Sequence, residues 1–188
     1  MGNSIIERRF AKKLKNRKNK SIVELYIKND SDFYNNYSYL NNIDNKNIMI
    51  NENVINYLVK ETENISIKNS LLIYIKKISK VLQQEDSIEK LIKEDIHEKI
   101  FIISKRIRNI NIHSIILALI GMLLIGITQL PKFEAKYFSF KEFVIVMSWV
   151  FMWKAVDLIF FEKAGLLKKR GTLMKIYFSE IKIENISE

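Results

Sequence analysis

The chain has 188 residues, a net charge of +10, no cysteine, two histidines, one proline and five glycines. The lack of cysteine excludes disulfides, thiolate metal sites and cysteine nucleophiles, and two histidines are too few for a histidine-built metal centre. Five glycines also argue against a glycine-rich phosphate loop, and no carboxylate pair or nucleophile triad stands out. We therefore expect one small domain with a membrane element, no catalytic activity and no cofactor.

Residues 1–20 form a basic arm that carries seven of the ten net charges, because eight basic residues accompany only one acidic residue, Glu7. Ile6, Phe10 and Leu14 recur every fourth residue, which predicts an amphipathic helix over about 4–18. Three interpretations stay open: contact with anionic lipid headgroups, binding of a nucleotide or single-stranded nucleic acid, or a solvated tether. The basic residues are Arg8, Arg9, Lys12, Lys13, Lys15, Arg17, Lys18 and Lys20.

Residues 21–108 are expected to form a cytosolic α+β domain. The stretch 29–56 holds ten asparagines and reads as loop with short structure, and its tyrosines, Tyr34 among them, are aromatic platforms for bases only if the fold brings them near the arm. Val54 to Val59 fits a short helix capped by Asn51 or Asn53. Residues 71–76 predict a strand, and Ile181 and Ile183 alternate as in a second strand that pairs with it.

From Ile88 onward, isoleucines advance by threes and fours, and no proline or glycine interrupts them before the apolar segment 109–131. This pattern predicts one continuous helix over about 87–130. The 23 residues of segment 109–131 contain no Asp, Glu, Lys or Arg and span about 34 Å as a helix, enough to cross a bilayer. His97 and His113 lie on this helix at no metal-ligand spacing.

A second apolar segment, 143–161, follows the short loop 132–142, so the two segments are expected to form an antiparallel transmembrane hairpin. Lysine and arginine are more frequent before the first segment and after the second than in the loop. The bias predicts an inner-membrane protein with both termini in the cytoplasm and a cytosolic tail, 162–188, that packs back on the N-terminal domain.

Lys154 and Asp157 interrupt the second segment three residues apart, so they lie on one helix face and can pair. Such groups either face a subunit seam or water-filled path, or form a structural ion pair near the inner leaflet. Ser114, with Ala118 and Gly121, forms a small-residue face on the first segment. Small residues allow close helix packing, either within the hairpin or between copies.

The sequence WVFMWKAVDLIFFE at residues 149–162 resembles the second-helix motif of small bacterial two-span membrane proteins. The plan of a cytosolic domain followed by a hairpin is similar to that of membrane effectors in nucleotide-signalled antiphage systems, nearest the effectors of the Hailong system. This resemblance implies an oligomeric ion channel whose cytosolic domain binds a polyanionic signal, there single-stranded DNA made by a nucleotidyltransferase partner.

Two hypotheses follow. In the first, copies of the chain form a homo-oligomeric inner-membrane pore that the cytosolic domain gates, since a hairpin alone cannot enclose a conduit. In the second, the hairpin only anchors a non-catalytic binding or scaffold module in the lipid bilayer.

Overall fold

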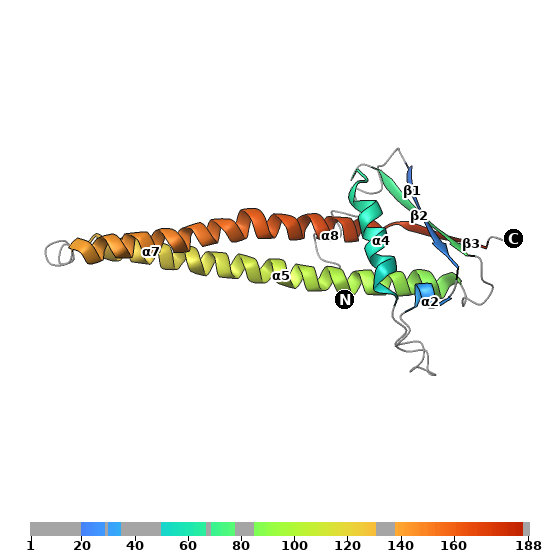
Figure 1. The fold of residues 1–188 in the computed structure, drawn as a ribbon, viewed down its shortest axis with the longest axis horizontal. Coiled ribbons are helices and arrows are strands. Elements are labelled where there is room, and N and C mark those ends of the chain that lie inside the picture. Colours follow the sequence, from blue (N-terminus) through green and yellow to red (C-terminus); the bar gives the residue numbers. More distant parts are fainter. Residues whose placement is uncertain are drawn as a thin grey trace, which may run out of the picture. The chain divides into compact units, whose positions relative to one another are not determined.

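The computed structural model describes residues 20–28, 30–34, 50–66, 69–77, 85–130 and 138–185. The described chain is mostly helical, with one small sheet (Figure 1). Its elements are, in order, β1 (Lys20–Ile27), α2 (Asp30–Phe33), α4 (Glu52–Glu63), β2 (Ser70–Lys77), α5 (Glu85–Thr128), α7 (Phe138–Asp157), the π-helical turn η1 (Leu158–Glu162), α8 (Lys163–Tyr177) and β3 (Glu180–Asn185).

The chain divides into two compact units. Unit 1 contains residues 1–101 and 169–188, and unit 2 contains residues 102–168. Helices α5 and α8 each begin in one unit and end in the other. Unit 2 is therefore joined covalently to unit 1 by two helices.

The sheet of unit 1 has three parallel strands in the order β1-β2-β3. The predicted strands at 71–76 and 181–183 are confirmed, and so is their pairing, which aligns Ile73 with Ile181 and Ile75 with Ile183. Strand β1, which we did not predict, pairs with β2 along its whole length. Because parallel strands need a crossover connection, the chain that leaves the sheet at the end of β2 has to return to the opposite end of the sheet, where β2 begins, before it enters β3. The whole of unit 2 lies within that crossover.

One face of the sheet is buried. Val23, Leu25 and Ile27 alternate with the exposed Ile22 and Tyr26, as expected for a strand with one covered face. Strand β2 adds Ile73 and Ile75 to this core. Three helices also contribute buried side chains: Ile55 and Leu58 from α4, Ile88, Ile92 and Ile96 from the start of α5, and Leu173 and Ile176 from the end of α8. Both helices that lead to unit 2 are thus anchored in this core.

The predicted short helix is present as α4, and Asn51 caps it, because its side chain accepts a hydrogen bond of 3.0 Å from the Asn53 amide. At the other end, Lys175 of α8 is buried and its ammonium donates to the carbonyls of Thr62 (3.4 Å) and Ile65 (2.6 Å). A cation at a helix C-terminus interacts favourably with the helix dipole. Lys175 therefore ties α8 to the end of α4.

The long helix predicted over 87–130 is confirmed as α5. Its buried residues continue into unit 2 in two interleaved series, and within each series the residues are seven positions apart. The first series is Ile96, Ile103 and Ile110, and the second is Ile100, Ile107, Ser114, Gly121 and Thr128. On α7 the buried Ser148 and Ala155 are also seven apart. This spacing is typical of two helices packed along a coiled-coil seam, and Figure 1 shows α5 and α7 side by side in unit 2.

The second apolar segment is also helical, but the helix extends beyond the predicted end at 161. It continues through η1 and α8 as far as Tyr177. Two helical stretches, 88–128 and 140–177, are long and apolar enough to cross a membrane by length and composition, and only 17% of the apolar window of each is buried. A core helix of a soluble protein is mostly buried, so this degree of exposure favours a membrane environment.

The uncovered face of the sheet carries an ion pair between neighbouring strands. Glu24 and Lys76 approach to 2.8 Å, and the Tyr26 hydroxyl donates to Glu24 (2.8 Å) and accepts from Lys76 (3.2 Å). The hydrogen bond from Lys76, with that from Tyr26, lowers the pKa of the Glu24 carboxyl below 4.5. The pair connects the edge strand β1 to β2.

A carboxyl whose pKa is lower in the folded chain stabilises the fold above its unfolded pKa, and this contribution is lost as the pH falls through the folded value. We therefore expect Glu24→Gln to lower the thermal unfolding midpoint of unit 1 at neutral pH, and the difference from wild type to shrink as the pH falls below 4.5. Thermal melts followed by circular dichroism, from neutral pH to below pH 4.5, measure the unfolding midpoints of the variant and the wild type. A difference that is constant with pH would contradict the assignment.

Gly121 permits the close approach of α5 and α7. A Cβ added there would lie 2.8 Å from Met152 Cγ and 3.1 Å from the Ser148 carbonyl oxygen, whereas a Cβ at Gly126 would meet nothing within 4 Å. We expect Gly121→Ile to destabilise the detergent-solubilised hairpin by about 1–3 kcal/mol through overpacking. Gly126→Ile is the matched control, and equal effects of the two substitutions on thermal unfolding would exclude a specific packing role for Gly121.

Candidate functional site

The second apolar helix carries a cluster of three charged side chains. Lys154 Nζ lies 2.6 Å from Asp157 Oδ2 and 3.4 Å from Glu162 Oε1. The side chains are partly exposed, at 51% for Lys154, 39% for Asp157 and 43% for Glu162. The cluster therefore lies on the open side of the helix, away from the seam in which Ser148 and Ala155 are buried.

The π-helical turn η1 brings Glu162 into this cluster. In a regular α-helix, a residue eight positions further on lies about 80° away around the axis. The turn over 158–162 contains one residue more than an α-helical turn and so rotates Glu162 back toward Lys154. Single π turns of this kind occur frequently at functional sites. Sequence spacing identified the Lys154–Asp157 pair but not Glu162, because nothing in the sequence indicated the irregular turn.

Apolar and aromatic side chains border the cluster and form an open groove along α7 with Lys154 and Asp157: Val146, Trp149, Val150 and Trp153. Trp149 and Trp153 are among the most exposed large side chains of the chain, the latter at 71%. Exposed aromatic groups around a partly neutralised ion cluster are typical of a contact surface. The groove can thus accept another apolar helix that also offers polar groups.

The small-residue face that we predicted is divided between different environments. Ser114 and Gly121 are buried, and Gly121 lies against Ser148 and Met152 of the same chain, while Ala118 is only partly buried. The Ser114 hydroxyl donates to the Asn111 carbonyl (2.9 Å). Ser114 therefore belongs to the seam within the hairpin, and it does not lie in the Lys154 cluster.

Most of the basic arm lies outside the described residues, which include only Lys20 of the predicted set. Lys20 begins strand β1 and is exposed. Tyr34 is buried and packs edge-to-face on Phe33, with ring centroids 5.0 Å apart. Tyr34 is therefore not available as an aromatic platform for nucleic acid bases.

The described residues offer no group of three or more metal-ligating side chains. His97 lies beside Tyr177, with ring centroids 5.8 Å apart, and His113 is exposed on α5. The histidines are thus well separated along the helix and form no common site.

Comparison with the known protein families, with curated protein sequences and with solved structures finds no match for this chain, so its function has to be argued from the charged cluster, the seam and the exposed faces themselves.

Proposed function

We propose that the chain is an inner-membrane protein whose hairpin spans the bilayer, and that several copies assemble into an ion-conducting pore gated by the cytosolic unit. The main observation that supports this proposal is the Lys154–Asp157–Glu162 cluster on the open side of an apolar helix. Ionisable groups inside membrane spans usually face a partner helix or a water-filled path, because lipid cannot solvate them.

The depth of the cluster supports this proposal. The charge-free part of α5, residues 109–128, is about 30 Å long, close to the thickness of a hydrocarbon core, and its midpoint lies between residues 118 and 119. Gly121 lies against Ser148 and Met152, so Lys154 on the antiparallel helix is level with about residue 117, only about 2 Å from that midpoint. A charge at this depth costs about 2.5–3.5 kcal/mol on insertion scales if it faces lipid. The pairing with Asp157 and contact with a second copy both reduce this cost.

A two-helix hairpin cannot enclose a conduit, so the pore requires several copies. The groove of Val146, Trp149, Val150 and Trp153 supplies the contact surface in this proposal. Packing against another copy would cover the aromatic side chains, and the ion clusters of neighbouring copies would then line or flank the shared path.

Gating would act through the two helices that connect the units. Helix α5 continues for 44 residues from unit 1 into unit 2, and Lys175 fixes α8 to the end of α4. A ligand that changes the packing of unit 1 would therefore act on both membrane helices. The charge of the arm favours a polyanion, either a nucleotide or a single-stranded oligonucleotide. A role in antiphage defence, with a nucleotidyltransferase partner, rests on the resemblance to Hailong effectors.

The alternative is a membrane-anchored scaffold. Unit 1 has its own buried core, which is the observation that favours an independent interaction module. Replacement of residues 102–168 by an unrelated transmembrane hairpin separates the two functions. A scaffold keeps its cellular activity after this exchange, and a pore loses it.

The pore predicts that the charged cluster is needed for conduction. Lys154→Leu/Asp157→Leu removes two opposite charges without changing the net charge, and we expect at least a tenfold loss of membrane depolarisation on induced expression. A voltage-sensitive dye measures the effect. Lys141→Leu/Glu142→Leu, which removes an equivalent pair from the start of the same helix, is the matched control and should depolarise like the wild type.

Unchanged depolarisation by the Lys154→Leu/Asp157→Leu variant would assign the cluster a structural role only. Membranes that remain polarised with the wild-type chain, both without ligand and with single-stranded oligonucleotides supplied, would refute the pore itself.

A further inference from the structure

Basic side chains gather where the charge-free stretch of unit 2 ends. Helix α5 contributes Lys105, Arg106 and Arg108, and α8 contributes Lys163 and Lys168. All are exposed except Lys163, which is half-buried. Glu162 is the one acidic residue between positions 102–108 and 162–168, and it already contacts Lys154. We call the five basic residues, Lys105, Arg106, Arg108, Lys163 and Lys168, the basic belt.

The belt is narrow along the helix axes. The contact of Gly121 with Ser148 and Met152 places Gly121 opposite about residue 150, and the two helices run antiparallel from there. At equal rise per residue, Arg108 is therefore at the same height along the helix pair as about residue 163, and Lys168 at the same height as about residue 103. The five side chains therefore originate within about 8 Å along the axes. This depth matches the headgroup layer, which adds about 5–8 Å on each side of a bilayer core.

The belt also adjoins apolar surface directly. The charge-free stretch begins at Asn109, and Ile112, Ile115 and Ile116, within the next two turns of α5, are exposed, whereas Ile110 is buried in the seam. On the other helix Phe160 and Phe161 are exposed beside the belt. A row of cations at the edge of an apolar surface fits a phosphate group with acyl chains attached to it better than it fits a free anion.

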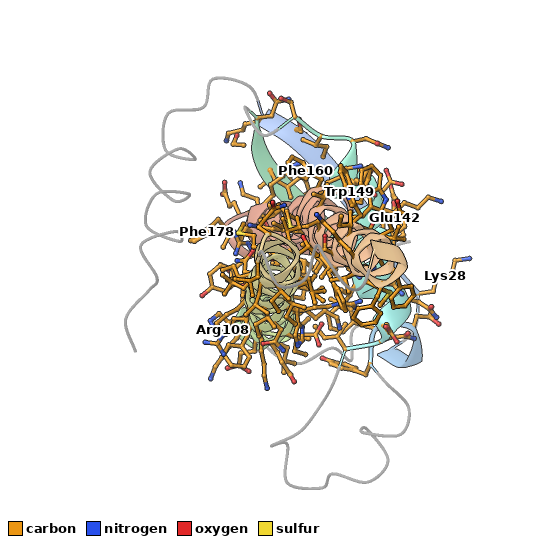
Figure 2. All side chains as sticks on the ribbon, turned by 90° about the vertical axis from the view of Figure 1, so that its left-hand side faces the viewer. Lys28, Arg108, Glu142, Trp149, Phe160 and Phe178 are labelled. Atoms are coloured by element: carbon orange, nitrogen blue, oxygen red, sulfur yellow. The ribbon has the colours of Figure 1, made fainter. Side chains whose placement is uncertain are left out.

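The belt does not coincide with the groove assigned to contacts between copies. Figure 2, which looks along the helix pair, shows Arg108 of the belt on the side opposite to Trp149 of the groove. At the other end of the hairpin, the described residues 138–142 carry one basic and one acidic side chain, Lys141 and Glu142. Positive charge is therefore concentrated at one end of the hairpin, where residues 102–108 and 162–168 carry a net charge of +4, against +1 for the loop 132–142. The part of the belt on α5 remains accessible when the groove is covered.

We propose that the basic belt is a binding site for anionic phospholipid headgroups in a single leaflet, the one next to unit 1. The proposal rests on the hairpin being inserted in the bilayer, as in the proposed function, but not on conduction. Arg106 and Arg108 are suited to bidentate contacts with phosphate oxygens, and the lysines act as point charges. Each basic group near such a surface contributes about fivefold in affinity, from about 1 kcal/mol.

The test is native mass spectrometry of the full chain in detergent, titrated separately with phosphatidylglycerol, phosphatidylcholine and inorganic phosphate. We expect saturable binding of phosphatidylglycerol in preference to the other two, and a loss on the order of a hundredfold in affinity when three belt charges are removed. The belt variant is Lys105→Gln/Arg106→Gln/Arg108→Gln, and the charge-matched control in unit 1 is Lys28→Gln/Lys60→Gln/Lys90→Gln, which should bind like the wild type.

Equal retention of phosphatidylglycerol and phosphatidylcholine, or equal losses in the two variants, would overturn the headgroup site. Tighter binding of inorganic phosphate than of lipid would replace it by a free-anion site. Carbonate extraction of membranes distinguishes a failure of the headgroup site from a failure of the proposed membrane insertion. A chain that resists extraction but shows no lipid preference refutes the belt alone, and a chain that is extracted refutes the inserted hairpin as well.

Discussion

A charge in the middle of a bilayer has to be neutralised and shielded from lipid, and this constraint governs the account of unit 2. Lys154 is partly neutralised by Asp157 and Glu162, but all three side chains remain exposed on the single chain. The seam within the hairpin is already filled by Ser114, Gly121 and their neighbours on α7, so the cluster has no shelter inside its own chain. In the proposed pore, another copy of the chain, water or both shield the cluster from lipid.

The topology of unit 1 explains how a small domain could act on such a cluster. Strands β2 and β3 are parallel neighbours, and the connection between them contains both apolar helices. A parallel pair requires a crossover, and here that crossover is extended into unit 2. In the proposed pore, a rearrangement of β2, β3 or α4 would therefore act through two helices, one anchored by Ile88, Ile92 and Ile96, the other by Lys175.

Sequence periodicity predicted α5 and the β2–β3 pairing well, because uninterrupted apolar spacing dominates these segments. Residue type restricted the cap of α4 to Asn51 or Asn53, and the structure shows Asn51 in that position. Strand β1 was missed because the charge pattern assigned Lys20 to the arm, and its alternation of Val23, Leu25 and Ile27 continues directly from that basic run. Helix α8 was not predicted, because the helix was ended where the apolar segment ends at 161, and the tail 162–188 was predicted only to pack back on the N-terminal domain. Burial of Leu173 and Ile176 in unit 1 favours the helix there. The third member of the ion cluster depends on a π turn, which no periodicity reveals.

The number of chains in the assembled particle tests the central claim most directly. Light scattering of the purified full chain in mild detergent or nanodiscs, corrected for the bound amphiphile, gives that number. The account predicts a particle of several copies that converts to smaller species when Val150 and Trp153 in the groove are replaced by polar residues. A wild-type chain that remains a single copy under all these conditions would leave the Lys154 cluster facing lipid and would contradict the account.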